Sequence, residues 1–307
     1  MTGVICLSLQ TMQPVPVPPS CVLCLGNFDG VHVAHRALMH TAAKLRAHRF
    51  PDAVCGVFCF DPPSSDFLQD KVAHLCTREE KLERFREVGM EYAFLADFQS
   101  LRSYSPEQFV LDVLKNECHC VAAVCGFNHR FGHRGAGNPT LLQKLLDGPV
   151  EVQEAISEFG DVVSSSRIRN LLWEGDAARA AKLLSKPYTI QAEVLHGKAL
   201  GRKWGFPTVN QKFPKNALIP KFGVYVTDCT LPNGLHCRGV SNVGKRPTVD
   251  LDDTVNCETH LIDFEGDLYG EQLTVAFLHY LRPEKKFQST EELRAQIEAD
   301  KNTAKEY

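Results

Sequence analysis

The strongest constraint on the fold is an alternation of short apolar segments with helical segments, which runs from residue 21 to residue 184 and then stops. A capping box of Thr77 and Glu80 starts one of these helices, and Ser105-Pro106 starts another. The apolar segments predict buried strands at 21–25, 53–60, 92–95 and 120–125. Such alternation is typical of an α/β domain, a Rossmann-like parallel sheet with helices on both faces.

From about residue 187 the sequence consists of short β-rich segments separated by glycine, proline and asparagine. This pattern predicts a small antiparallel β-barrel or sandwich. The last segment, 290–307, has the composition of an amphipathic helix with Ser289 or Thr290 as its N-cap. A chain of 307 residues is long for one core. We therefore expect two domains, at 1–185 and 186–307.

The composition is that of a soluble globular protein, with 44% hydrophobic and 23% charged residues. A net charge of −3 argues against a nucleic-acid binder that works through a general basic surface. No segment approaches the roughly 20 apolar residues of a membrane span, and the first ten residues lack the basic start of a signal peptide. We expect a cytoplasmic protein without nucleic-acid or membrane partners, and self-association stays open.

The chain has twelve cysteines, which raises the question of a metal site or a disulfide framework. Cys55, Cys59 and Cys125 lie within apolar runs, where a thiol behaves as a small core hydrophobe. Zinc takes four ligands from paired short spacings, and the pair Cys21 and Cys24 has no second pair. Reduced core thiols are therefore favoured over structural zinc.

The segment GNFDGVHVAHRALMH, residues 26–40, follows the first strand of the predicted sheet. Ligands bind at the carboxyl ends of strands in such sheets, and the N-terminus of the next helix favours anions. His32 and His35 lie on one face of the first helical turn, where both could donate hydrogen bonds to a polyphosphate. As zinc ligands they would need a further partner, and Asp29 is the local candidate.

This segment resembles the HxGH signature of nucleotidyltransferases, in the form found in prokaryotic bifunctional riboflavin kinase/FMN adenylyltransferases. Three further motifs match that family in order: CFDPPSSDF at 59–67, CGFNHRFGHRGAGN at 125–138 and SSSRIRNLLWEGD at 164–176. The resemblance implies that His32 and His35 stabilise charge at the α-phosphate of ATP, with Arg169 as a further catalytic cation. It implies ATP-binding residues at Gly26, Phe28, Asp29, Gly30, Ser165 and Ser166, and an FMN-binding residue at Asn128.

The second domain contains HGKALGRKWGFPTVN, residues 196–210, which is not a Walker A loop. Its last six residues resemble the P-T-A-N motif of riboflavin kinases. Thr208 and Asn210 offer hard oxygen ligands, which suit Mg²⁺ bound to ATP. The resemblance makes Glu258 the base for the riboflavin hydroxyl, where a solvated strand glutamate is the plainer interpretation. It also implies ATP binding by Gly197, Lys198 and Gly201, and flavin binding by Arg282.

The resemblance implies a bifunctional enzyme that uses ATP and Mg²⁺. Riboflavin is phosphorylated to FMN in the barrel domain, and FMN is then adenylylated to FAD in the α/β domain. Two departures favour an alternative, a riboflavin kinase with an impaired N-terminal domain: Ala34 replaces the glycine of HxGH, and Pro63 replaces a histidine of the second motif. A second alternative is a flavin- or nucleotide-binding module without turnover.

Overall fold

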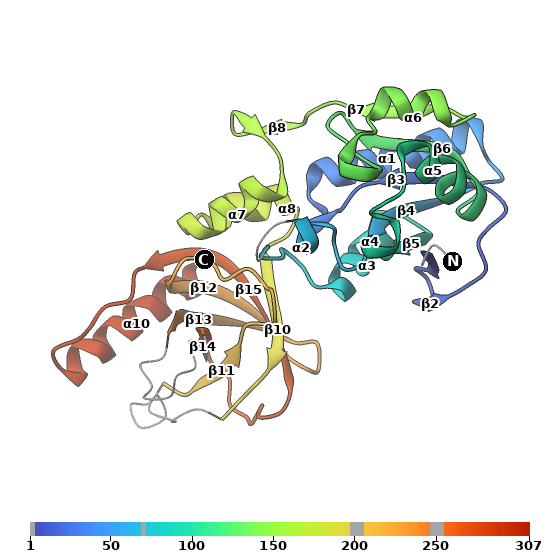
Figure 1. The fold of residues 1–307 in the computed structure, drawn as a ribbon. Helices are drawn as coiled ribbons and strands as arrows, with labels where there is room; N and C mark the ends of the chain where they lie inside the picture. The colour runs from blue at the N-terminus through green and yellow to red at the C-terminus, as the bar shows by residue number, and fades with distance from the viewer. Residues whose placement is uncertain (1–3, 69–71, 197–205, 246–254) are drawn as a thin grey trace. The chain divides into compact units, whose positions relative to one another are not determined.

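The structure is a computed structural model that describes residues 4–68, 72–196, 206–245 and 255–307. It divides into two compact units: Met1–Val72 with Cys76–Ser165, and Ala73–Leu75 with Ser166–Tyr307 (Figure 1).

The first unit is built on a seven-stranded sheet in the order β2-β1-β5-β4-β3-β6-β7. Its strands are β1 (Val4–Ser8), β2 (Gln13–Pro14), β3 (Cys21–Leu25), β4 (Val54–Phe60), β5 (Tyr92–Ala96), β6 (Cys120–Gly126) and β7 (Val150–Gln153). In this order, the neighbouring strands β5, β4, β3, β6 and β7 pair in parallel, which confirms the predicted parallel sheet. The antiparallel strands β1 and β2 extend it past β5 and were not predicted.

Helices cover both faces of this sheet, as the alternation predicts (Figure 1). The helical segments of the unit are η1 (Asp29–Val31), α1 (Val33–Arg49), α2 (Ser65–Leu68), α3 (Arg78–Glu87), α4 (Phe98–Leu101), α5 (Pro106–Gln108), the π-helical η2 (Phe109–Glu117), η3 (His133–Gly135) and α6 (Pro139–Leu145). Helices α1 and α3 pack on one face, and η2 and α6 pack on the other. A two-stranded hairpin of β8 (Ser157–Glu158) and β9 (Asp161–Val162) follows.

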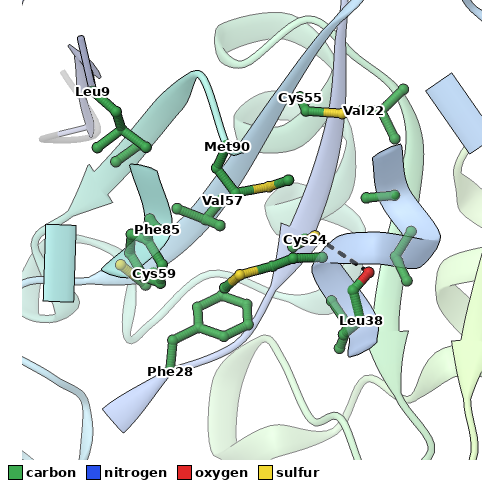
Figure 2. Packing of buried hydrophobic residues seen from close by; sticks show 14 of the residues in the cluster. Leu9, Val22, Cys24, Phe28, Leu38, Cys55, Val57, Cys59, Phe85 and Met90 are labelled. Carbon is green, nitrogen blue, oxygen red and sulfur yellow. Dashed lines mark hydrogen bonds between the residues drawn. The ribbon is translucent and has the colours of Figure 1, made fainter. Parts of the chain in front are cut away.

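Cysteines fill the core as small hydrophobes. On the α1 and α3 face, Cys24, Cys55 and Cys59 are buried among aliphatic and aromatic side chains (Figure 2). The Cys24 thiol donates a hydrogen bond to the Leu38 carbonyl over 3.8 Å. Burial raises the pKa of all three thiols, so they are neutral and unreactive near pH 7. All twelve cysteines of the chain are free thiols.

The second unit is an antiparallel six-stranded sheet in the order β10-β15-β12-β13-β14-β11. Its strands are β10 (Tyr188–Glu193), β11 (Thr208–Lys212), β12 (Gly223–Thr230), β13 (His236–Lys245), β14 (Val255–Leu261) and β15 (Gln272–Arg282). The Leu195 N–H donates to the Asn210 carbonyl over 2.8 Å, which links the segment after β10 to β11. The edge strands of the sheet therefore meet, and the sheet rolls up as the predicted barrel.

In the described part of the second unit, the helices are α7 (Ser165–Glu174, all but its first residue), α8 (Ala177–Leu184) and α10 (Thr290–Glu306). Ser289 caps α10, whose Ala304 is buried against Val226 and Ile262. Helix α8 packs on β10 and β15, so the compact units assign α7 and α8 to the barrel, whereas the predicted boundary at 185/186 assigned them to the first domain.

Candidate active sites in the two units

The segment after β3 turns sharply because three of its residues have left-handed backbone conformations. Phe28 has φ 55°, Gly30 has φ 79° and Val31 has φ 43°. A β-branched residue at positive φ is strained by about 1–3 kcal/mol and persists only where its surroundings hold it. Val31 is fully buried, which supplies that constraint. The turn brings His32 to the N-cap position of α1.

Two side chains near α3 hold the turn through Gly30. The Arg84 guanidinium donates to the Gly30 carbonyl over 2.8 Å, and the Gly30 N–H donates to the Cys76 sulfur over 3.3 Å. Arg84 is only 2% exposed. Neither residue was predicted from the sequence. Spacing alone gave no signal for Arg84, because it is two residues from Leu82 and one from Phe85, whereas neighbours on a helical face are three or four residues apart.

The turn brings the two predicted histidines together as a stacked pair. Their ring centroids are 3.6 Å apart at an interplanar angle of 16°, and the His35 N–H donates to His32 Nδ1 over 3.4 Å. Burial lowers the pKa of His35 well below its usual value, and the neighbouring His32 and Lys81 lower it further. Within the described residues, His35 Nδ1 is buried without a hydrogen-bond partner. The pair therefore offers a neutral His35 ring to a ligand.

The histidine pair lies at the carboxyl end of β3, beside β6. The connections from β3 and β6 lead to opposite sides of the sheet, which makes this edge a topological switch point, the usual place for ligands in such sheets. The predicted FMN-binding residue Asn128 is exposed in the turn that follows β6. Ser165 donates through its hydroxyl to the Asp29 carbonyl over 3.0 Å. The first unit thus brings the predicted Asp29, His32, His35 and Ser165 to one edge.

The other predicted phosphate ligands of this site, Ser166 and Arg169, belong to the second unit. Arg169 donates there to the Ala73 carbonyl over 2.7 Å. Their part in the polyphosphate site stays a prediction. Ala34 lies half-buried in the first turn of α1, and Pro63 precedes Ser64, whose hydroxyl hydrogen bonds to Asn27 over 3.1 Å.

In the barrel, polar side chains from three neighbouring strands form a row. Asn210 on β11 is the register partner of Glu258 on β14, which in turn is the partner of Asn242 on β13. Successive residues of a strand point to opposite faces, so these three share one face with Thr208. Burial alternates along β14, because the side chains of Cys257 and Thr259 are fully buried while that of Glu258 is half-buried. The predicted magnesium ligands and the predicted base thus lie on neighbouring strands.

The start of β11 is fixed from β14. His260 hydrogen bonds through Nδ1 to the Pro207 carbonyl at 2.9 Å, directly before Thr208. A cavity of about 60 Å³ opens here, lined by Thr208 and, among others, Val194, Leu261 and Tyr269. The predicted ATP-binding residues Gly197, Lys198 and Gly201 lie outside the described residues.

Arg282, predicted to bind flavin, is engaged with the C-terminal helix. Its guanidinium contacts the Asp300 carboxylate at 2.7 Å through Nη2 and at 3.1 Å through Nε, and it donates to the Pro283 carbonyl at 3.2 Å. Asp300 is only 6% exposed. These contacts anchor α10 to the end of β15, and flavin binding by Arg282 stays a prediction.

Neither unit builds a protein-only metal centre in the part of the chain that the structure describes, where no group of three histidine, cysteine, aspartate or glutamate side chains could hold an ion. The oxygen atoms of Thr208 and Asn210 are of the kind that Mg²⁺ prefers, and a magnesium ion carried by ATP needs few protein ligands. The residues present therefore fit a nucleotide-bound Mg²⁺. They do not support the zinc site weighed for Cys21 and Cys24, which are both buried in the core.

Comparisons with known proteins match both units. Residues 15–167 match the family described as FAD synthetase, and residues 184–307 match the family described as riboflavin kinase. The bifunctional riboflavin kinase/FMN adenylyltransferase of Listeria monocytogenes is 33% identical over 292 residues, covering 93% of this chain and 92% of the relative. The protein of the same description from Escherichia coli K12 is 34% identical over 293 residues, covering 94% and 92%.

Among solved structures, one described as a macrolide-efflux protein from Streptococcus pneumoniae superposes with a TM-score of 0.86 at 28% identity, covering 98% of this chain and 97% of that one. The two chains therefore share their fold over nearly their full lengths. Among the described residues of this chain, no helix is both long enough and apolar enough to cross a membrane.

Proposed function

The chain belongs to the family of bifunctional riboflavin kinase/FMN adenylyltransferases, and we propose that it makes FAD from riboflavin in two ATP-dependent steps at two separate sites. The barrel unit phosphorylates riboflavin to FMN. The sheet unit transfers the adenylyl group of a second ATP to FMN, giving FAD and pyrophosphate. The observation that carries this proposal is that the chain has two compact units and that each unit matches its own enzyme family.

In the first reaction, Glu258 is the general base. Its carboxylate accepts the proton of the riboflavin 5′-hydroxyl while that oxygen attacks the γ-phosphate of ATP. Its position supports this role, because Asn210 is its register partner and Thr208 shares the same face of the sheet. Thr208 and Asn210 would hold the Mg²⁺ of ATP, which supplies charge neutralisation on the phosphates. Gly197, Lys198 and Gly201 complete the proposed nucleotide-binding segment.

In the second reaction, the FMN phosphate attacks the α-phosphate of ATP in line, and pyrophosphate leaves. No covalent bond to the protein is needed, so the protein contributes positioning and charge stabilisation. His32 and His35 hydrogen bond to the phosphates at the start of α1, where the turn of Gly26, Phe28, Asp29 and Gly30 brings the backbone close. Asn128 orients FMN, and Ser165, Ser166 and Arg169 bind the outer phosphates.

The proposed location is the cytoplasm, which the twelve free and mostly buried thiols support. The proposed partners are the small molecules riboflavin, FMN and ATP. The absence of nucleic-acid and membrane partners, and any self-association, stay predictions.

The proposal is tested by incubating the protein with riboflavin, ATP and Mg²⁺ and separating the flavins by chromatography. We expect FMN to appear first and FAD to follow. FMN without FAD would instead support the kinase-only alternative, and no product would support a binding module without turnover.

Replacing the base separates the two reactions. Glu258→Gln should slow FMN formation by roughly 10²–10⁴-fold, because the hydroxyl loses its proton acceptor. The same variant should convert supplied FMN to FAD at the parent rate. The matched control is Glu265→Gln, which changes an exposed glutamate in the same unit and should leave both reactions unchanged. A Glu258→Gln variant with the parent kinase rate would exclude this residue as the base.

A further inference from the structure

Lys81 in α3 is a lysine buried in the protein interior. It is 5% exposed, and lysine is rarely buried to this extent unless it is paired. A buried charge is costly unless groups of opposite charge face it, and an anionic ligand would add to that compensation.

The packing of α3 aims Lys81 at the turn after β3. Arg84 and Phe85, three and four residues further along α3, lie on the same face of the helix as Lys81. Arg84 donates to the Gly30 carbonyl over 2.8 Å, and the Phe85 ring meets the edge of the Phe28 ring at 5.6 Å (Figure 2). Phe28 in turn contacts the His35 ring at 5.2 Å. Lys81 therefore faces the segment that carries the histidine pair.

The groups that face the ammonium are two thiols and two carboxylates: Cys59, Cys76, Asp61 and Asp29. Burial opposes the charge on Lys81, but these neighbours more than offset it, so its pKa lies above its ordinary value and the side chain is a cation near pH 7. Its charge contributes to the lowered pKa of His35. The first unit thus combines a neutral His35 ring with a fixed positive charge at the same edge of the sheet.

The neutral His35 ring and the Lys81 cation suit the negative charge that develops during adenylyl transfer. When the α-phosphate is attacked, negative charge builds on the departing pyrophosphate, and a buried cation stabilises it more than an exposed one would. A neutral imidazole donates one hydrogen bond but supplies no net charge. We propose that Lys81 contacts the triphosphate of ATP and stabilises the pyrophosphate as it leaves. This inference rests on the proposed adenylyl transfer in the first unit.

The test compares Lys81→Met, Lys81→Arg and, as a matched control, Lys44→Met, which removes an exposed lysine of the same unit. Adenylylation of supplied FMN, the reverse reaction of FAD with pyrophosphate, and riboflavin phosphorylation are each measured. Lys81→Met should lower kcat/KM for ATP by about 10²–10³-fold and raise KM for pyrophosphate, with KM for FMN and the kinase rate unchanged. Lys81→Arg, which keeps the charge, should retain adenylylation within about tenfold, and Lys44→Met should match the parent.

Thermal unfolding separates function from structure. The raised pKa means that the folded state favours the charged form of Lys81, so Lys81→Met should lower the unfolding midpoint, whereas Lys81→Arg keeps the charge and should lower it less; activities are compared where both variants are folded. Three results would overturn the inference: a parent rate in Lys81→Met, a rise in KM confined to FMN, or equal losses of activity and stability in the Met and Arg variants.

Binding of Mg²⁺-pyrophosphate, measured by calorimetry, separates this inference from the proposed function. A parent protein that binds pyrophosphate through Lys81 but forms no FAD would contradict adenylyl transfer and leave the phosphate contact standing. A parent protein that forms FAD while Lys81→Met binds pyrophosphate equally well would overturn the inference alone.

Discussion

Two imidazoles of the first unit, on His35 and His129, each have a buried ring nitrogen without a hydrogen-bond partner within the described residues. Burial lowers the pKa of both, and that of His129 falls to about 4, with the neighbouring Arg130 as a further cause. His129 stacks on the Phe131 ring at 5.8 Å, in the loop that carries Asn128. These residues are therefore neutral rings whose protonation works against the fold.

His129 should make stability fall in acid. Its pKa is lower in the folded state than in the unfolded chain, where it is about 6.5, so the unfolded state binds the proton first. The free energy of unfolding should fall by about 2 kcal/mol as the pH drops from 6.5 to 4, which is less than the full shift because the ring keeps partial exposure. Urea unfolding across this range should show a shallower decline for His129→Gln.

The control for this measurement is His40→Gln, which changes an exposed histidine on α1. It should reproduce the pH dependence of the parent. A decline as steep in His129→Gln as in the parent would assign the acid sensitivity to other groups.

Residues of a site that are near in sequence were predictable, and those brought together by packing were not. His32 and His35 are three apart, so helix geometry alone puts them on one face. Arg84 and Lys81 lie about fifty residues further along the chain, and only the packing of α3 on the turn after β3 joins them to the pair. For the same reason the sequence did not indicate that Arg282 would be engaged by Asp300.

At the scale of elements, local signals located the helix starts. The predicted capping box is formed: the Glu80 N–H donates to Thr77 Oγ1 over 3.2 Å, and the Thr77 N–H donates to Glu80 Oε2 over 2.8 Å. Strands β1 and β2 were missed because the short apolar segment VICLS does not by itself indicate a strand, and its pairing partner β5 lies some ninety residues away. Helix α10 forms as predicted, but its buried positions include the charged Asp300 beside Ala304.

The ion pair of Arg282 and Asp300 should be the main anchor of α10. Asp300→Ala should lower the free energy of unfolding by about 2–3 kcal/mol, because it leaves a partly buried guanidinium without its carboxylate. The matched control is Lys305→Ala, which breaks the exposed pair of Lys305 with Asp263 on the same helix and should cost under about 1 kcal/mol. Equal losses in the two variants, measured by urea unfolding, would contradict the anchoring role.

At the scale of the whole molecule, the chain combines two folds in two compact units. The change from strand–helix alternation to short β segments predicted both folds, because each periodicity is local. The assignment of α7 and α8 was harder to predict. Helical composition does not indicate against which core a helix packs. In the structure, α8 packs on the barrel strands β10 and β15.

The central claim, two independent sites on one chain, is tested most directly by mixing two inactivated variants. Glu258→Gln should lack the kinase step, and His35→Asn should lack the transfer step by about 10²–10³-fold. With riboflavin, ATP and Mg²⁺, the first variant alone should give no product, the second should accumulate FMN, and the mixture should form FAD. Absence of FAD from the mixture, or loss of both reactions in either variant, would contradict the claim.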